Sequence, residues 1–179
     1  MNICPRYLLS AILSMLILLL CACPDNKKPA QSETLPSQII TDFKLFESTS
    51  GLKLYRVNAA KAYVYSDAQK IDVDNPYIIF YNEDGTVSST LNSLRGSVNT
   101  KNSNLFLKDS VLVQTQDSTI LHTDSLIWNN QEQIITTDAW VIIESKQGKI
   151  TGQGLISDAG LKKIEIKSSV TGKSHYEFK

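Results

Sequence analysis

Cysteine and histidine are scarce in this sequence, and both are poorly placed for chemistry. The three cysteines, Cys4, Cys21 and Cys23, all precede residue 24, and the two histidines are His122 and His175. A domain formed by the rest of the chain contains no thiol, which excludes disulfides, zinc–thiolate sites and cysteine catalysis in that domain. We therefore expect no metal site and no cofactor.

An excess of charge of one sign is also missing. The chain carries 18 lysines and arginines against 18 aspartates and glutamates, without a basic block, and this balance predicts no nucleic-acid partner. The segment His122-Thr123-Asp124-Ser125 contains the residue types of a catalytic triad. On a strand, however, Ser125 points away from His122 and Asp124. We expect no catalytic residue, and so no enzyme.

The one long hydrophobic run is short for a membrane span. Residues 8–20 are apolar except for two serines and follow Arg6, whereas a spanning helix needs about 20 apolar residues. This pattern is typical of a secretory signal peptide. The segment Leu20-Cys21-Ala22-Cys23 resembles the lipobox of bacterial lipoproteins, in which the last cysteine is acylated and becomes the mature N-terminus.

We therefore predict a lipoprotein-type signal peptide over residues 1–22 and a lipid anchor at Cys23. Two alternatives are a plain cleaved signal peptide, in which Cys23 is incidental, and an uncleaved helix that stays in the membrane. Residues 23–38 are polar and contain proline, which predicts a flexible tether. The remaining residues, 39–179, are enough for one domain with a real core.

The predicted domain consists of strands. Short runs rich in β-branched and aromatic residues alternate apolar and polar side chains with period two, as half-buried strands do. They are GLKLYRVNA, KIDVDNPYIIFYN, NLFLKDSVLVQT, QIITTDAWVIIES and LKKIEIKSSVTG. Turn-forming residues separate such runs at 83–85, 116–118, 146–148 and 158–160. No stretch past residue 39 shows three turns of helical periodicity, so the sequence predicts an all-β domain.

A repeat of about 30 residues runs through these strands. Each copy places a short polar segment between two apolar strand halves, which predicts a kink. The segments are Asp74-Asn75-Pro76-Tyr77, Lys108-Asp109-Ser110-Val111, Thr137-Asp138-Ala139-Trp140 and Lys167-Ser168-Ser169-Val170. Stacked units of this kind bury their apolar faces between two packed sheets, and the unpaired strands at the two ends can accept a partner's strand.

The order of these motifs resembles one known family. Gly51 to Ala62 reads G-x-x-x-Y-x-x-x-A-x-x-A, and it is followed by NPYIIFY, by a turn that carries Leu126, Trp128 and Asn129 after His122-Thr123-Asp124, and by ITGQGLISDAGLKKIEI. This arrangement is similar to that of the LptC family of lipopolysaccharide-export proteins, over roughly residues 38–177. The resemblance implies a twisted β-jelly roll of two open antiparallel sheets, of the OstA/LptA-like type.

The resemblance also implies a function and partners. Members take lipopolysaccharide from an inner-membrane ABC transporter, hold its acyl chains in an apolar groove between the sheets, and pass it to a periplasmic shuttle protein that is LptA-like. One strand edge meets the jelly-roll domain of the transporter permease and the other meets the shuttle. We expect the chain in the periplasm, held at the inner membrane by the N-terminal lipid or by the uncleaved helix.

Alternation along the strands selects the candidate groove residues. Ile71, Val73, Leu105, Leu107, Ile164 and Ile166 are expected to point inward. The pairs Tyr77 with Ile79 and Trp140 with Ile142 are added, although both faces of those strands are apolar. Val57, Val111 and Val113 complete the candidate lipid contacts. The partner edges are assigned to Asp42, Phe43, Gly152, Gly154 and Tyr176.

Three points stay open at this level. Gly152 and Gly154 indicate either a bulge with close backbone approach or a simple turn. The inward residues fit a filled sandwich core as well as a groove, so an alternative is a structural or protein-binding surface lipoprotein. A shuttle-type relative that polymerises end to end is a further possibility.

Overall fold

The computed structural model describes residues 35–174 of the chain, and side chains up to Lys173. Eleven strands follow one another in these residues. They are β1 (Gln38–Thr49), β2 (Leu52–Tyr65), β3 (Lys70–Asp74), β4 (Tyr77–Tyr81), β5 (Val87–Asn92), β6 (Arg95–Asn99), β7 (Leu105–Thr115), β8 (Ile120–Asn129), β9 (Ile134–Ser145), β10 (Gly148–Asp158) and β11 (Ile164–Ser174). Within this part of the chain, no helix is long and apolar enough to cross a membrane.

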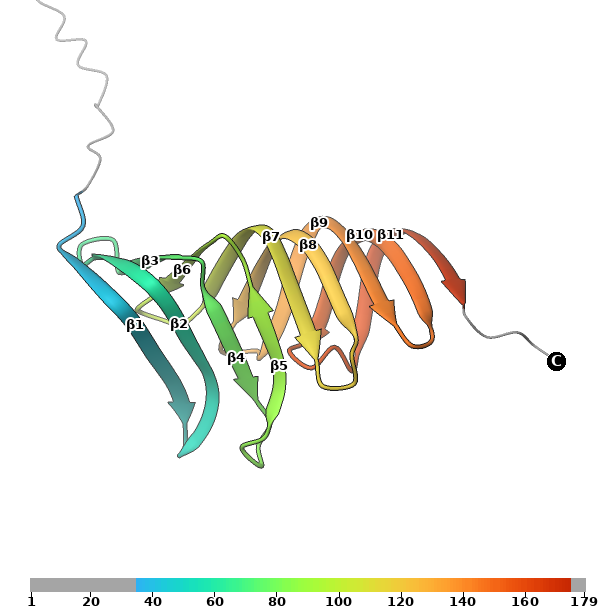
Figure 1. Cartoon of the computed structure of the whole chain (residues 1–179), viewed down its shortest axis with the longest axis horizontal. Helices are drawn as coiled ribbons and strands as arrows, with labels where there is room; N and C mark the ends of the chain where they lie inside the picture. Colours follow the sequence, from blue (N-terminus) through green and yellow to red (C-terminus); the bar gives the residue numbers. More distant parts are fainter. Residues whose placement is uncertain (1–34, 175–179) are drawn as a thin grey trace, which may run out of the picture. The chain divides into compact units, whose positions relative to one another are not determined.

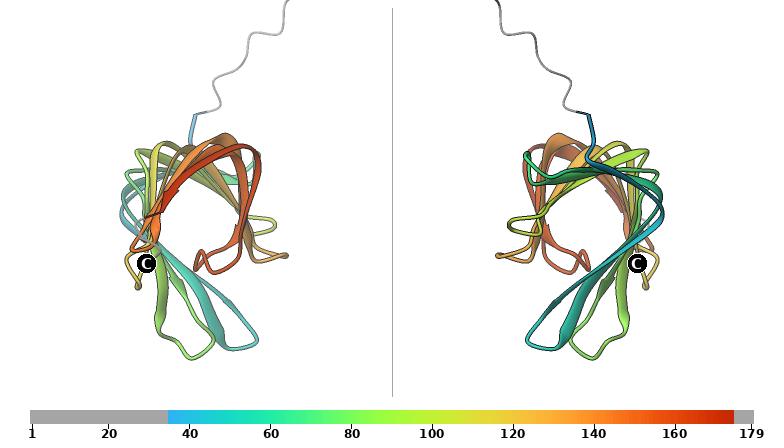
Figure 2. Two further views of the ribbon diagram at one scale, coloured as in Figure 1. Left: turned by 90° about the vertical axis from the view of Figure 1, so that its right-hand side faces the viewer. Right: turned by 90° about the vertical axis from the view of Figure 1, so that its left-hand side faces the viewer.

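All strand pairs are antiparallel, and the strands fold over into two layers (Figure 1). β7 shows how the layers are joined, because its first half, 105–108, pairs with β6 and its second half, 112–115, pairs with β5. β2 is divided in the same way between β3 and β4. We call the two layers the β3–β6 layer and the β4–β5 layer. Figure 2 looks along the resulting roll.

Kinks lie where the chain crosses from one layer to the other. Asn75, between β3 and β4, has a φ of 47°, and Asp109 in β7 has a φ of 65°. Ser169 in β11 has a φ of 55°, and the β9–β10 register shifts opposite residues 138–139. Asn and Asp adopt this left-handed conformation more readily than most residues. The four kinks predicted from the repeat are therefore confirmed.

The turns and the strand content also agree with the sequence. The structure is all-β, and the turn at 83–85 carries Gly85 at a φ of 81°. Thr115 accepts a backbone hydrogen bond of 3.2 Å from Ser118 at the second predicted turn. β1 begins at Gln38, one residue before the predicted domain boundary.

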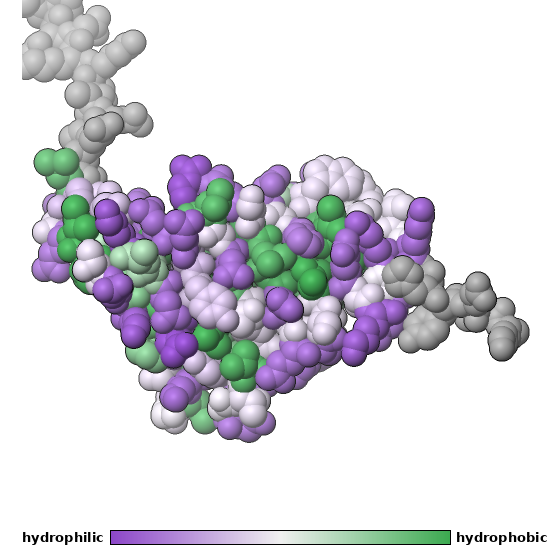
Figure 3. All heavy atoms as spheres, viewed as in Figure 1, coloured by the Kyte–Doolittle hydropathy of each residue, from purple (hydrophilic) through white to green (hydrophobic). Residues whose placement is uncertain are grey.

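The core lies between the layers. Along β7, Leu105, Leu107, Val111 and Val113 are each 1% exposed, whereas the intervening Phe106 is 41% exposed. This alternation puts one face of each strand into a continuous apolar cluster and the other toward solvent. On the outer surface in Figure 3, polar side chains surround scattered apolar ones.

Candidate functional site

The inner faces of the two layers form the candidate site. Most of the predicted groove residues lie there, in one buried cluster. They are Val57, Ile71, Val73, Leu105, Leu107, Val111 and Val113. Ile166 is half-buried against the same cluster, and Ile164, two residues earlier on β11, is 39% exposed. The structure thus brings these residues together from four strands, β2, β3, β7 and β11.

Three predicted groove residues face outward. Tyr77 is 41% exposed, and Trp140 and Ile142, which alternate with the core residues Val141 and Ile143, are 57% and 37% exposed. Their expected inward orientation is therefore wrong, whereas Ile79 is buried, at 8% exposed, outside the main cluster. Both faces of β4 and β9 are apolar, so alternation alone left the choice of the inward face undetermined.

Hydroxyl groups are the polar groups of this interior. The buried polar residues in the described part of the chain are Ser89, Ser93, Thr115, Thr123, Thr137 and Ser157. Ion pairs lie at exposed positions instead, as between Lys70 and Asp72 at 2.9 Å. Charge buried without a partner costs several kcal/mol, and an interior without it favours an apolar occupant.

An aromatic cluster fills the middle of the interior. The ring centroids of Phe80 and Trp128 are 4.7 Å apart, and Tyr55 lies 5.8 Å from Phe80 and 6.4 Å from Trp128. Tyr55 and Phe80 belong to the β4–β5 layer and Trp128 to the β3–β6 layer, so these contacts join the layers. None of the three was predicted, although Tyr55 shares a strand face with Val57 and alternation from Val57 would have selected it.

Hydrogen bonds tie the two layers together along the open side of the roll. The Tyr55 hydroxyl donates to the Ser103 carbonyl at 2.7 Å. Asn130 Nδ2 donates to Glu47 Oε1 at 3.4 Å. Burial is the main cause that raises the pKa of Tyr55, and the charge of Glu47 raises it further. Tyr55 is therefore a neutral donor throughout the physiological range.

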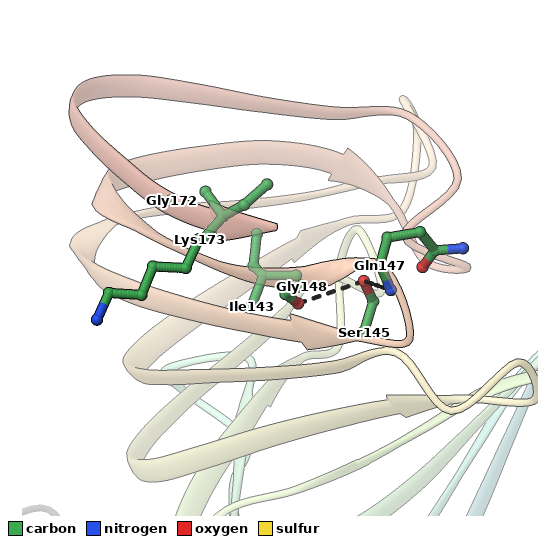
Figure 4. Close-up of a pocket in the computed structure, with 7 residues that line it drawn as sticks. Ile143, Ser145, Gln147, Gly148, Gly172 and Lys173 are labelled. Atoms are coloured by element: carbon green, nitrogen blue, oxygen red, sulfur yellow. Dashed lines mark hydrogen bonds between the residues drawn. The ribbon is translucent and has the colours of Figure 1, made fainter. Parts of the chain in front are cut away.

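The C-terminal end of the interior is hollow by contrast. A cavity of about 340 Å³ lies on the inner side of β9, β10 and β11, and Figure 4 shows the residues around it. Ile150 faces inward and is 42% exposed. Its partners on the neighbouring strands are Ile143 of β9 and Gly172 of β11. The Ser145 hydroxyl accepts a hydrogen bond of 3.2 Å from the Gln147 amide and shapes the adjoining turn.

The two end strands have free edges among the described residues. β1 pairs with β2 and β11 pairs with β10. Asp42 and Phe43 lie on β1, where Asp42 has a φ of 51° and Phe43 is turned into the core. Their placement on an edge strand agrees with the sequence assignment, whereas a role in partner binding stays a prediction.

Gly152 and Gly154 do not lie on an edge. Both belong to β10, which is bonded to β9 on one side and to β11 on the other, so their assignment to the partner edge is wrong. Of the two alternatives left open for these glycines, the bulge is the one present: the register shifts around Gly154, which has a φ of +73°. The predicted close approach is present too, since a Cβ on Gly152 would lie 2.4 Å from Ile166 Cγ2.

Cys23 and Tyr176 lie outside the described residues. The lipid anchor predicted at Cys23, the signal peptide and the tether therefore stay predictions, as does an edge role for Tyr176.

Fold and interior together define an open β-jelly roll that encloses an apolar space. The family model for lipopolysaccharide-assembly, LptC-related proteins matches residues 7–177. The chain belongs to this family, as its motifs predicted. Membership implies a role in lipopolysaccharide transport, in which proteins of this family are non-catalytic periplasmic components. No curated protein matches the chain.

Proposed function

We propose that this chain receives lipopolysaccharide from the inner-membrane ABC transporter into the space between its sheets and passes it to a periplasmic shuttle protein. The observation that carries the proposal is the inner face at β10 and β11, where Ile150 points into the roll and is still 42% exposed. Burial of an acyl chain contributes about 0.8 kcal/mol per methylene and needs no polar partner. An apolar face that is open at one end suits such a ligand.

The end strands support transfer between similar modules. In the described residues β1 and β11 each offer one unpaired edge, and a strand of another jelly roll can add to such an edge through main-chain hydrogen bonds. We assign the β1 edge to the jelly-roll domain of the transporter permease and the β11 edge to the shuttle. The lipid at Cys23, or the uncleaved N-terminal helix, would hold the chain at the inner membrane.

Photo-crosslinking in cells tests the groove with two matched isoleucines. Ile150 and Ile142 lie on neighbouring strands and are 42% and 37% exposed, but Ile150 faces inward and Ile142 outward. A photoreactive amino acid at Ile150 is expected to give a lipopolysaccharide adduct, and the same group at Ile142 is not. Equal labelling at both positions would point to non-specific contact with lipid.

The filled aromatic cluster favours a second candidate, a structural or protein-binding lipoprotein whose sandwich core holds no ligand. Tyr55, Phe80 and Trp128 leave little space in the middle of the roll, because their exposed fractions are 1%, 2% and 4%. Absence of any adduct at Ile150, in an abundant and folded protein, would contradict lipid transport and favour this candidate. End-to-end assembly into a shuttle-type polymer would appear as concentration-dependent sedimentation.

A further inference from the structure

The loop between β10 and β11 crosses the opening between the two layers. It leaves the β3–β6 layer at Asp158 and lies at the open, lower side of the roll in Figure 2. The Asp158 carboxylate holds its shape by accepting hydrogen bonds from the amides of Gly160 at 2.8 Å and Lys163 at 2.9 Å. The Leu161 amide donates to the Asp158 carbonyl at 3.1 Å. We call residues 158–163 the strap.

Contacts with β5 fasten the strap to the opposite layer. The Ser89 hydroxyl, on a residue 1% exposed, donates to the Ala159 carbonyl at 2.6 Å. Leu161 is 7% exposed and belongs to the core cluster, although its φ of 53° lies in the left-handed region that side chains disfavour. Gly160 lies against Ser88. One interlayer hydrogen bond and one buried side chain in a strained conformation thus hold the strap.

The space beside the strap is small for a ligand in this structure. A cleft of about 240 Å³ beside it reaches Phe80 and Trp128, whereas ligand pockets usually measure about 300–1,000 Å³. Ser157, which precedes the strap, is 3% exposed, and its hydroxyl has no hydrogen-bond partner. Buried hydroxyls are nearly always paired, so this one is available to an ester or hydroxyl oxygen of an acylated ligand.

We propose that the strap is a gate: it opens to admit an acyl chain from the side of the roll into the middle of the interior, and it closes when the chain has left. This inference rests on the proposed function and adds a control point to it. The hollow at β10 and β11 would accept the end of a chain with the strap closed. Residence along the whole interior would require the Ser89 to Ala159 hydrogen bond to break and Leu161 to leave the core.

A reversible lock tests the gate in the full chain. The Cβ position of Gly160 is 2.9 Å from Ser88 Oγ, which brings the two Cβ positions close enough for a disulfide, whose Cβ atoms lie about 3.5–4.5 Å apart. The double variant Ser88→Cys with Gly160→Cys is oxidised, and the binding of dansyl-undecanoic acid is followed by its fluorescence. Affinity is expected to fall by about tenfold or more when the strap is locked, and to return with dithiothreitol.

Each control separates the gate from the groove. The two single cysteine variants should bind the probe as the unmodified protein does. If the locked and reduced forms bind equally well, the gate is wrong and the groove stands. If the unmodified protein does not bind the probe at all, the proposed function fails and the gate fails with it.

A second pair of variants tests the gate without a disulfide. Ser89→Ala removes the interlayer hydrogen bond and should speed association of the probe about fivefold, the effect of one net hydrogen bond. Ser93→Ala is the matched control, because Ser93 is 7% exposed and its hydroxyl donates to the Arg95 carbonyl within the same segment, at 2.9 Å. Equal association rates for the two variants would overturn the gate.

Discussion

The middle of the roll and its C-terminal end have the same apolar lining but differ in access. In the middle, Trp128 of one layer meets Phe80 and Tyr55 of the other, so each inner face covers its opposite. At the C-terminal end Ile150 remains exposed, and its neighbour on β11, Gly172, has no side chain to cover it. The difference shows that an inward apolar residue marks a groove only where the surrounding strands leave it uncovered.

The largest expected effect comes from two isoleucines, one in the packed middle and one at the C-terminal end. Ile135 is 1% exposed, whereas Ile150 is 42% exposed. Ile135→Ala should lower the free energy of unfolding by about 2–5 kcal/mol, because it leaves a cavity in a packed core. Ile150→Ala should cost less than about 1 kcal/mol, since much of its side chain already contacts water. Urea denaturation followed by circular dichroism measures both, and similar losses would mean that the C-terminal end is as well packed as the middle.

Two glycines sharpen the view of the open end. A Cβ on Gly152 would meet Ile166 Cγ2 at 2.4 Å, so Gly152→Ala forces β11 away from β10 and should cost about 1–3 kcal/mol. At Gly172, the matched control, the nearest atoms to a Cβ lie at 3.5 and 3.6 Å, an ordinary contact distance. Gly172→Ala should therefore be close to neutral. Faster amide hydrogen exchange in β11 of the Gly152 variant alone would confirm that the close approach holds this edge.

Sequence reasoning located the fold because the signals for it are local. Asn75 before Pro76 and Asp109 before Ser110 mark kinks, and Gly85 marks a turn, each through a backbone conformation that the residue tolerates. Period-two alternation then placed Val73 and Leu107 on the inner face. These features depend on neighbours along the chain, and one sequence suffices to read them.

The site was harder to predict because it depends on contacts between layers. Trp140 was placed inside although it is 57% exposed, since an apolar strand face does not show which side the second layer covers. At Gly154 the sequence left a bulge and a turn open; the structure has the bulge, and the strand lies one place in from the edge. The turn at 158–160 was predicted, whereas its hydrogen bond to Ser89, 70 residues away in sequence, left no local sign.

The smallest predicted effect concerns the closed middle, at the Tyr55 hydroxyl. Tyr55→Phe removes the hydrogen bond to the Ser103 carbonyl and should cost about 0.5–1.5 kcal/mol at neutral pH. The free energy of unfolding of the parent protein should also fall as the pH rises above about 10, the pKa of a tyrosine in an unfolded chain. Burial raises the pKa of Tyr55 in the folded state, so alkali ionises the unfolded side chain first and draws the equilibrium toward unfolding.

The Tyr55→Phe variant is also the control for that pH dependence. Without an ionisable group at position 55 its loss of stability above pH 10 should be shallower, and the difference between the two proteins should shrink as pH rises. Urea midpoints at pH 7, 9 and 10.5 measure this, with Tyr81, which is less buried than Tyr55, changed to Phe for comparison. Parallel curves for the Tyr55 variant and the parent would mean that water reaches the hydroxyl, and that the middle of the roll is more open than its packing indicates.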